Sequence, residues 1–432
     1  MTEHDAMTEH SSRIEGFYKL PIAERVRIVQ EFANLTDDEA KSLTGAAIDP
    51  SIPDRMVENA VGAFPIPLGI AMNFTINGKD YLVPMAIEEP SVVAAASNAA
   101  KMARDRGGFS TSSTDPVMIG QVQITGVKDP EDAKKRLLQR KDDLLMLANA
   151  QDPMLIKLGG GARDLEVRVI KTLEGPNVIV HLLIDVRDAM GANAVNTMAE
   201  ATAPLIEEIS GGKVYLRILS NLAVHRLARA QAVWSKESIG GPEVVDGVVQ
   251  AYLFAEADPF RCATHNKGVM NGIDAVILAT GNDTRAIEAG AHSYAARSGA
   301  YKPLTKFERT KDGDLLGSIE LPMAVGLVGG ATKVHPTAKA CVKLLGVRTA
   351  RELGEIVAAV GLAQNFAALR ALATVGIQKG HMTLHAKNVV ISAGSPPELV
   401  DEVVRIIVAE KKIRMDRAQE VIAELKKKRG MT

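Results

Sequence analysis

The sequence predicts an α+β fold: a large α/β-rich domain, interrupted by a small ferredoxin-like βαββαβ domain and followed by a helical cap. Its 432 residues exceed the roughly 250–300 at which a single core stops growing. The hydrophobic period also switches repeatedly between that of a strand and that of a helix from 121 to 219. We expect a large domain over 1–114 and 218–375, a small domain over 115–217 and a C-terminal cap over 376–432.

The first half of the small domain reads as a strand, a helix and a hairpin. QVQITGV (Gln121–Val127) alternates between polar and apolar residues, as a strand does. Asp129 and Pro130 form a helix start, and the leucines of Glu131–Ala150 keep helical spacing. LEVRVI (Leu165–Ile170) and NVIVHLLIDV (Asn177–Val186), joined through EGPN, predict two paired strands.

The second half adds a helix and a closing strand. Gly191–Ser210 has helical character and is followed by two glycines, which commonly end a helix. KVYLRIL (Lys213–Leu219) then predicts a strand. The order βαββαβ is that of the ferredoxin-like, split βαβ arrangement. In the cap, Pro396–Lys412 and Met415–Arg429 predict two amphipathic helices.

Composition excludes several classes of function. The chain has 51 Lys and Arg against 52 Asp and Glu, so it has no strongly basic surface that would indicate a nucleic-acid partner. Its two cysteines cannot form a disulfide framework or a zinc site. The polar, acidic N-terminus lacks the pattern of a signal peptide, and no apolar run approaches the roughly 20 residues of a membrane span. We therefore expect a cytoplasmic protein with no membrane partner and no metal.

Three small-residue stretches could approach an anionic ligand. DVRDAMGANAVNTM (Asp185–Met198) joins an apolar strand to a helix, and free N–H groups at such a helix start can bind phosphate. A tight packing turn explains it equally well, and it does not match the dinucleotide fingerprint GxGxxG. GGGARD (Gly159–Asp164) and GLVGGATK (Gly326–Lys333) are less specific and can be plain loops.

Two glutamates precede a predicted helix. Glu88 and Glu89 follow a strand-like run, and Pro90 stands near the start of an Ala-rich helix. Carboxylates there can simply stabilise the helix dipole, an explanation that suits Glu88 better than Glu89.

Lys267 lies between Asn266 and Gly268, which we interpret as a bend, and NGIDAVILATG after it predicts a buried strand. A lysine at the edge of a core needs a partner, and Asp283 at the end of the apolar run is the local candidate. A structural ion pair remains an equal alternative.

His381 follows a glycine where the large domain gives way to the cap, and His385 lies four residues further on. The two histidines could form a metal pair, but no third ligand is near, so we do not predict a metal site. A lone histidine is usually structural or exposed to solvent.

These motifs together resemble hydroxymethylglutaryl-coenzyme A reductase, and specifically its soluble, bacterial second class. The resemblance covers nearly the whole chain and has no counterpart of the eukaryotic membrane anchor. It rests on segments in family order, namely ENAVGAFPIPLGIA (Glu58–Ala71), EEPSVVAAAS (Glu88–Ser97), RDAMGANAVNTMAEA (Arg187–Ala201), RILSNLA (Arg217–Ala223), RCATHNKGVMNGIDAVILATGND (Arg261–Asp283), VGLVGGATK (Val325–Lys333), LAQN (Leu362–Asn365) and GHM (Gly380–Met382).

The resemblance implies a four-electron reduction of a thioester by two nicotinamide hydrides, through a hemithioacetal and mevaldehyde, to mevalonate and coenzyme A. It assigns the oxyanion to Lys267, its orientation to Asp283 and a proton for the aldehyde to Glu89. His381, in a mobile cap, would protonate the departing thiolate. The implied catalytic residues are therefore Glu89, Lys267, Asp283 and His381.

The same resemblance implies the binding residues. The large domain would bind the coenzyme A thioester through Ser91, Asn221, Arg261 and Asn365. The small domain would bind the cofactor through Asp152, Asp188, Ala189, Met190, Gly191 and Asn193. An acid at Asp152 would hydrogen-bond the adenosine ribose and repel a 2′-phosphate, so we expect NADH to be preferred, with NADPH possible. Cys262 stands where relatives often carry alanine, and no base is placed to make it a nucleophile.

Family members have their active site between two subunits, so the resemblance also implies a homodimer or a higher homo-oligomer. Two alternatives remain. The same site could run physiologically in reverse and oxidise mevalonate. In another class, the ferredoxin-like domain could bind a ligand or RNA, but its first three predicted strands hold no aromatic residue on which a base could stack.

Overall fold

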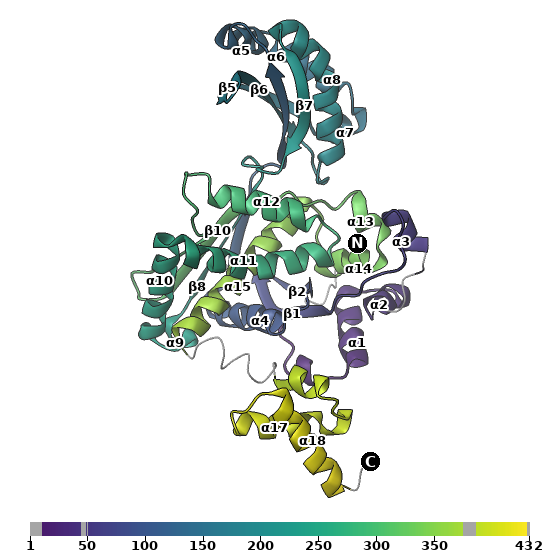
Figure 1. The fold of residues 1–432 in the computed structure, drawn as a ribbon, viewed down its shortest axis with the longest axis vertical. Coiled ribbons are helices and arrows are strands. Elements are labelled where there is room, and N and C mark those ends of the chain that lie inside the picture. The colour runs from purple at the N-terminus through teal and green to yellow at the C-terminus, as the bar shows by residue number, and fades with distance from the viewer. Residues whose placement is uncertain (1–10, 45–48, 50, 375–385, 430–432) are drawn as a thin grey trace, which may run out of the picture.

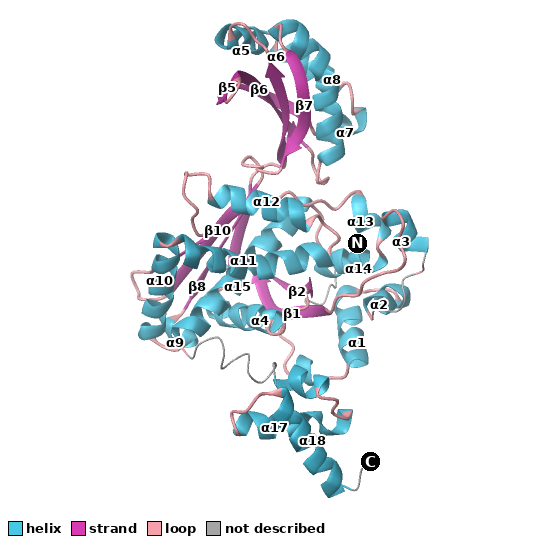
Figure 2. Cartoon of the chain, viewed as in Figure 1, coloured by secondary structure: helices cyan, strands magenta, loops and turns pink. Residues whose placement is uncertain are grey.

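A computed structural model describes residues 11–44, 49, 51–374 and 386–429. The chain forms an upper part built on one sheet, a larger middle part built on a second sheet, and a C-terminal helical part below (Figure 1). Helices and strands alternate through the upper and middle parts (Figure 2), which confirms the predicted α+β class.

The middle part is built on a six-stranded sheet in the order β2-β1-β3-β8-β10-β9. Adjacent strands pair antiparallel except β1 and β3, which are parallel. The connection from β3 to β8 is long because the upper part is inserted there, and the connection from β8 to β9 is long because it contains four helices. The strands are β1 (Leu68–Ile76), β2 (Lys79–Ala86), β3 (Phe109–Ser113), β8 (Leu227–Trp234), β9 (Thr305–Arg309) and β10 (Leu315–Pro322).

A long helix, α15 (Ala350–Ala373), forms the centre of the middle part. It packs against the sheet and against its neighbouring helices, and its residues from Ile356 to Phe366 are buried. Among the described helices it alone is long and apolar enough to cross a membrane, but 67% of its apolar window is buried inside the protein, as in a core helix. The surrounding elements are α4 (Val92–Ala103), η2 (Arg104–Arg106), α9 (Lys236–Ile239), α10 (Pro242–Ala257), α11 (Pro259–Ala279) and α12 (Thr284–Ala295).

The upper part contains a four-stranded sheet in the order β5-β6-β4-β7, with every adjacent pair antiparallel. With helices between β4 and β5 and between β6 and β7, this is the split βαβ arrangement. The hairpin and the closing strand are found where the sequence predicts them. The strands are β4 (Val117–Thr125), β5 (Gly161–Thr172), β6 (Gly175–Asp185) and β7 (Lys213–Ser220).

The helices of the upper part differ from the predicted pattern at two points: the first predicted helix is divided, and the short helix Pro153–Lys157 was not predicted. The single helix expected over Glu131–Ala150 is interrupted at Arg140, where ψ is 20°, and a new helix starts with Asp142 and Asp143 in its first turn. Acidic residues favour a helix start, whereas leucine spacing cannot reveal such a break. The helices are α5 (Pro130–Gln139), α6 (Lys141–Asn149), α7 (Pro153–Lys157) and α8 (Ala192–Ser210).

The predicted bend at Lys267 and the strand after it are wrong. Asp258 caps the N-terminus of α11, and the helix continues through Lys267 to Ala279. The glycines in this stretch serve helix packing: a Cβ added at Gly272 would lie 2.8 Å from Cβ of Gln364, and one at Gly361 would lie 2.8 Å from Ile273. The sequence motif therefore marks the close approach of α11 and α15.

Smaller elements complete the chain. The N-terminal helices and α14 share a small core around Val29, Leu82 and Leu344, and the C-terminal helices have a core of their own around Val403 and Val421. The predicted helix Met415–Arg429 is confirmed, whereas Pro396–Lys412 is shorter than predicted. These elements are η1 (Phe17–Lys19), α1 (Ile22–Ala33), α2 (Asp37–Leu43), α3 (Ser51–Met56), α13 (Gly330–Val334), α14 (Pro336–Leu345), η3 (Pro397–Leu399), α17 (Val400–Ala409) and α18 (Met415–Arg429).

Candidate active site

Lys267 and Glu89 meet at the surface of the middle part. Lys267 projects from α11, Glu89 precedes α4, and Lys267 Nζ donates to Glu89 Oε2 over 2.8 Å. Their side chains are 60% and 36% exposed, so solvent screens the pair and it contributes little stability. Because both side chains are accessible from solvent, the ammonium and the carboxylate can contact a bound ligand.

Ser91 and Arg261 add two polar groups without a partner in the described part of the chain. Ser91 is the N-cap residue of α4, with φ +77°, and its hydroxyl is buried without a hydrogen bond. Arg261 is half-buried in the first turn of α11, and burial lowers its pKa. An unpaired, partly desolvated guanidinium is suited to a carboxylate or phosphate. We call Lys267, Glu89, Ser91, Arg261 and Asn365 the lysine cluster.

Asn365 of α15 lies beneath this surface and is 1% exposed. Its Oδ1 accepts from the Thr305 hydroxyl at 2.7 Å, and its Nδ2 donates to the backbone carbonyl of His265 at 3.1 Å. Thr305 Oγ1 also lies 2.7 Å from His265 Nε2. Because the hydroxyl donates to Asn365, it accepts from His265, which assigns the proton to Nε2. This chain of bonds fixes the orientation of the Asn365 amide.

Two buried groups of α11 have strongly shifted pKa values. Burial lowers the pKa of His265 to about 3, so this ring is neutral. Burial, with the nearby Glu256 carboxylate, raises the pKa of the Cys262 thiol to about 11. A thiol that stays protonated is a poor nucleophile, in agreement with the expectation from the sequence.

Asp283 is not the partner of Lys267 within one chain. It caps α12, where its Oδ1 accepts from the backbone N–H groups of Arg285 and Ala286 at 3.0 and 3.2 Å, and its Oδ2 lies 3.3 Å from the Arg285 guanidinium. The expected local pair is therefore corrected to Lys267 with Glu89. The pair of Lys267 with Asp283 was expected because they are close in sequence. A helix separates them, where a bend and a strand were predicted.

The length of α11 sets how far apart Lys267 and Asp283 are. The twelve helical rises from Lys267 to Ala279, at about 1.5 Å each, span roughly 18 Å. The next turn stays at the helix end, because Asn282 N donates to the carbonyl of Ile277. Side chains of a helix also tilt toward its N-terminus, so Lys267 points away from that end.

Asp283 instead adjoins the turn that begins at Asp188. Asn282 Oδ1 accepts from Gly326 N at 2.7 Å, and the next amide, Leu327 N, donates to the carbonyl of Asp188 at 2.8 Å. A bridge pairs Ala189 with Val328. We call these segments, 188–191, 282–283 and 325–328, the turn cluster.

The turn from Asp188 to Gly191 presents a free helix start. Gly191 has φ +106° and precedes α8, whose N-terminus has no side-chain cap. An added Cβ at Gly191 would lie 2.7 Å from Val186, so this position also requires glycine. Asn193 is exposed in the first turn of α8. Exposed N–H groups and an uncapped helix dipole can bind a phosphate.

The two remaining predicted binding residues lie apart from the lysine cluster. Asp152 caps α7, where its carboxylate accepts from Leu155 N at 2.9 Å. Asn221 is exposed, and its carbonyl oxygen would lie 2.6 Å from a Cβ added to Gly290 of α12, which associates it with the helix that Asp283 begins.

His381 and His385 lie outside the described residues. Among the residues that the structure describes, no group of three or more His, Cys, Asp or Glu side chains could hold a metal ion.

Sequence reasoning missed Arg226, Asn282, His265 and Thr305. Arg226 is 4% exposed and donates to the carbonyls of Met190 and Ala189 in the turn cluster, at 2.9 and 3.1 Å. All four act on partners distant in sequence or through the backbone, so no local pattern distinguishes them. A buried arginine with no acidic neighbour in sequence is the only available signal.

Comparison with known proteins gives one consistent result. A family model described as hydroxymethylglutaryl-coenzyme A reductase matches residues 21–386. The 3-hydroxy-3-methylglutaryl-coenzyme A reductase of Archaeoglobus fulgidus is 62% identical over 416 residues, which cover 96% of this chain and 95% of the relative. A probable 3-hydroxy-3-methylglutaryl-coenzyme A reductase from Borreliella burgdorferi is 39% identical over 343 residues, which cover 78% of this chain and 77% of the relative. The class II enzyme of Streptococcus pneumoniae, solved bound to NADPH in open conformations, is 40% identical with a TM-score of 0.80, covering 94% of this chain and all of that one.

Proposed function

Because the chain belongs to the hydroxymethylglutaryl-coenzyme A reductase family, we propose that it interconverts 3-hydroxy-3-methylglutaryl-coenzyme A with mevalonate and coenzyme A by using two NAD(H). The observation that carries this proposal is the 2.8 Å contact between Lys267 and Glu89 at an accessible surface. One position there offers both a cation for an oxyanion and an acid for a proton. The family assignment replaces the alternative of an RNA-binding protein.

In the thioester step, Lys267 stabilises the oxyanion that forms when hydride attacks the carbonyl carbon. Arg261, half-buried and without a partner among the described residues, binds an anionic group of the substrate. Asn365 and Ser91 position the substrate by hydrogen bonds. His381 protonates the thiolate as it leaves, and Glu89 supplies the proton when the aldehyde is reduced.

The turn cluster fits a dinucleotide, because α8 begins there with an uncapped N-terminus beside an obligatory glycine. When bound, the nicotinamide supplies the hydride in both reductions. Asp188, Ala189, Met190, Gly191 and Asn193 would hold the cofactor, with the free N–H groups at the start of α8 available to its phosphates. Asp152 binds the adenosine ribose, which favours NADH. The S. pneumoniae relative binds NADPH, so the preference needs its own test.

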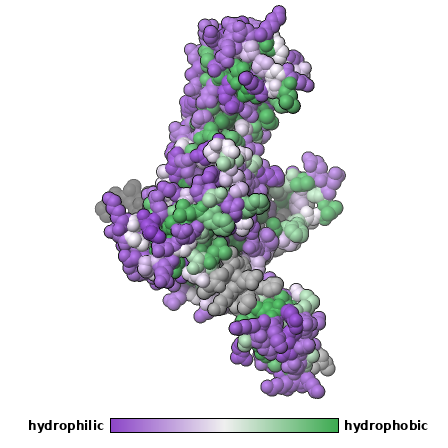
Figure 3. All heavy atoms as spheres, turned by 60° about the vertical axis from the view of Figure 1, so that its left-hand side comes forward, coloured by the Kyte–Doolittle hydropathy of each residue, from purple (hydrophilic) through white to green (hydrophobic). Residues whose placement is uncertain are grey.

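The active site forms between two subunits. A chain alone holds Lys267 roughly 18 Å of helix from the end that carries Asp283, so a site with both residues takes Asp283 from a second copy. An arm before β1 supports such an association: Val57, Val61 and Phe64 are 60%, 106% and 92% exposed. Other hydrophobic residues are also exposed on a surface that is mostly hydrophilic (Figure 3). We therefore propose that the protein is a homodimer or a higher oligomer. As expected from the sequence, we place it in the cytoplasm.

Mixing two inactive variants tests this assembly. Lys267→Ala and Asp283→Ala each remove a catalytic group, and a mixed dimer would hold one intact site and one doubly altered site. After random exchange of subunits, about a quarter of the wild-type activity should return. If the mixture stays as inactive as its components although subunits exchange, Asp283 does not act across the interface.

The function itself is tested by following absorbance of the reduced nicotinamide with hydroxymethylglutaryl-coenzyme A, and in reverse with mevalonate, coenzyme A and the oxidised cofactor. We expect turnover in both directions and higher kcat/KM with NADH than with NADPH. The same residues serve both directions, so mevalonate oxidation is the physiological alternative. A folded protein that turns over neither cofactor would overturn the proposal.

A further inference from the structure

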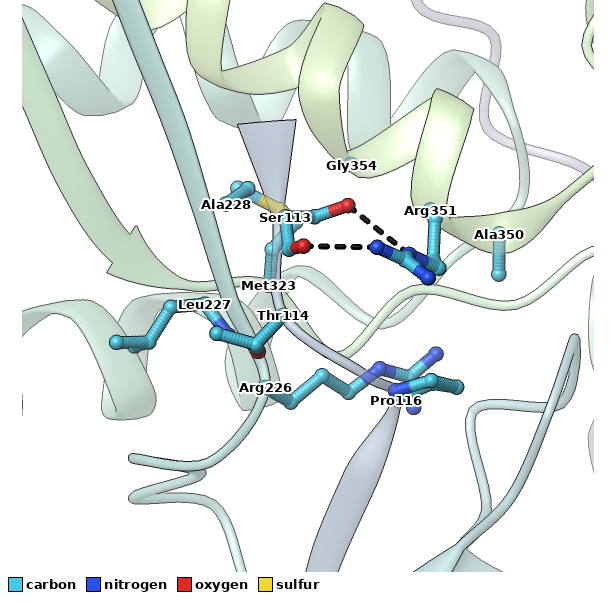
Figure 4. A pocket seen from close by; sticks show the side chains of 10 residues that line it. All are labelled: Ser113, Thr114, Pro116, Arg226, Leu227, Ala228, Met323, Ala350, Arg351 and Gly354. Atoms are coloured by element: carbon cyan, nitrogen blue, oxygen red, sulfur yellow. Dashed lines mark hydrogen bonds between the residues drawn. The ribbon is translucent and has the colours of Figure 1, made fainter. Parts of the chain in front are cut away.

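Two links join the upper and middle parts, and they are bonded to each other. The first link, 114–116, leads from β3 to β4, and the second, 221–226, leads from β7 back to β8. The Thr114 hydroxyl donates to the carbonyl of His225 at 2.7 Å and accepts from Leu227 N at 2.8 Å. A small pocket at this junction is lined by Thr114, Pro116, Arg226 and Arg351, among other residues (Figure 4).

Arg226, the last residue of the second link, carries a buried charge with an unusual set of partners. Its guanidinium donates only to backbone carbonyls: those of Met190 and Ala189 in the upper part and that of Val325 in the middle part. No carboxylate hydrogen-bonds it in the described part of the chain. The Asp188 carboxylate is near enough to favour the charged guanidinium but does not hydrogen-bond it, so the three carbonyls satisfy the buried donors. Because unsatisfied buried donors are costly, these carbonyls must be held in fixed positions around Arg226.

The segment from Val325 to Val328 continues the connection. Leu327 N donates to the carbonyl of Asp188, and Gly326 packs so closely on the turn that an added Cβ would lie 2.5 Å from Met190 N. On its other side, Gly326 N donates to Asn282 Oδ1 at 2.7 Å, next to Asp283. The side-chain amide of Asn282 is itself held by the Thr280 hydroxyl at 3.1 Å.

We propose that Arg226, Gly326 and Asn282 are positioning residues that hold the cofactor turn 188–191 and the turn bearing Asp283 in one hydrogen-bonded frame. The frame sets the hydride donor in register with Asp283 across two separate sheets. None of the three residues needs to touch the substrate. This inference rests on the proposed function, since it concerns the register of groups that are assigned there.

Arg226→Lys and Gly326→Ala break the frame in different ways. Lysine keeps the charge but cannot bond three carbonyls as a planar fork does. Alanine at 326 leaves every charge in place and pushes on the backbone of Met190. For both we expect a higher KM for NADH and an approximately 10²-fold loss of kcat, equal for the thioester and for mevaldehyde, because each step takes a hydride from a nicotinamide bound at the same site. The KM for the thioester should not change.

Arg351→Gln is the matched control. Arg351 lies at the same junction, where its guanidinium donates to Ser113 at the end of β3 (Figure 4) and to Asp115 of the first link. Its side chain makes no hydrogen bond to the cofactor turn, whereas the backbone N–H of the preceding residue, Ala350, donates to Asp188 Oδ1 at 2.8 Å and is kept in the variant. It should leave the NADH KM unchanged. Asn282→Asp, which keeps an acceptor for Gly326 N, should retain more activity than Asn282→Ala.

Amide hydrogen exchange gives a readout independent of turnover. In Arg226→Lys, the amides of Gly326 and Leu327 should exchange faster, while those of β8 and β10 stay protected. The proposal is overturned if the wild-type enzyme is active and both frame variants keep its NADH KM, or if Arg351→Gln raises that KM as much as they do. A wild-type protein with no activity on either substrate would instead count against the proposed function.

Discussion

The lysine cluster and the turn cluster differ in how the fold holds them. Lys267, Arg261 and Asn365 stand on α11 and α15, which pack through glycine contacts in the largest core. Asn365 and the two residues bonded to it or to its partner, Thr305 and His265, are 1–3% exposed and form the buried layer of this cluster. The turn cluster lies where two sheets meet, and it is joined to the middle part by backbone hydrogen bonds and one guanidinium.

This difference predicts two kinds of sensitivity. Groups of the lysine cluster cannot shift without unpacking the core, so substitutions there should change the chemistry or local contacts of the substrate. Groups of the turn cluster can lose their register by the loss of a few hydrogen bonds, so substitutions there should affect every step that uses the hydride. Thioester reduction and mevaldehyde reduction each take a hydride from a nicotinamide at the same site, but only thioester reduction expels a thiolate, so measuring both rates separates the two kinds of sensitivity.

The largest expected effect is confined to one rate. His381→Gln should slow thioester reduction by about 10²- to 10⁴-fold, because the variant cannot donate a proton to the departing thiolate. Mevaldehyde reduction expels no group and should stay nearly unchanged. His385→Gln is the control and should do little to either rate. Equal losses in both rates for His381→Gln would mean that the residue acts in positioning, as the turn cluster does.

Lys267→Ala should reduce both rates, by about 10²- to 10³-fold, because both hydride transfers develop negative charge on an oxygen. Lys267→Arg should fail largely as well, since a planar fork does not fit the place of a compact ammonium. The affinity for NADH, measured by equilibrium binding, should stay as in the wild type. A clear loss of NADH affinity would contradict the separation of the two clusters.

Thr305 tests the buried layer of the lysine cluster. Thr305→Val keeps the shape but leaves Asn365 Oδ1 and His265 Nε2–H unpaired, which costs about 1–3 kcal/mol for each group. The freed Asn365 amide should raise the KM for the thioester by about tenfold and leave the KM for NADH unchanged. Thr305→Ser keeps the hydroxyl and should restore the wild-type value. A loss of thermal stability alone, with both KM values intact, would show that the hydroxyl only stabilises the fold.

The sequence predicts one region of the molecule better than the other. In the upper part, alternation, the Asp129–Pro130 start and the glycines after Ser210 act locally, so the strands, the hairpin and α8 follow from short-range rules. In α11 the same rules failed, because Asn266 and Gly268 predict a bend and the stretch containing Gly272 predicts a strand. Only the fold shows that α15, about a hundred residues later, packs against both glycines. The family resemblance supplied the site residues, but it could not reveal which of them meet in one chain.

Contacts that depend on distant segments were invisible for the same reason. The bond from Thr305 to Asn365 spans 60 residues, and those from Arg226 to the cofactor turn span 36 and 37. No short pattern records such partners, since the fold alone brings them together. The residues that position the two clusters through such bonds can therefore be identified only from the structure.

The smallest effect concerns Asp152, at the outer edge of the cofactor site. Its carboxylate caps α7, so a structural role and a ribose-binding role compete. Asp152→Ser keeps a good N-cap and removes the charge, whereas Asp152→Ala removes both. If the charge repels a 2′-phosphate, both variants should narrow the ratio of kcat/KM for NADH over NADPH several-fold, through KM and to a similar extent. If the residue only caps the helix, Asp152→Ser should keep the wild-type ratio, and only Asp152→Ala should lower the stability of the upper part. The mevaldehyde rate at saturating cofactor should be unchanged in both variants, because Asp152 lies outside the frame that sets the register of the hydride.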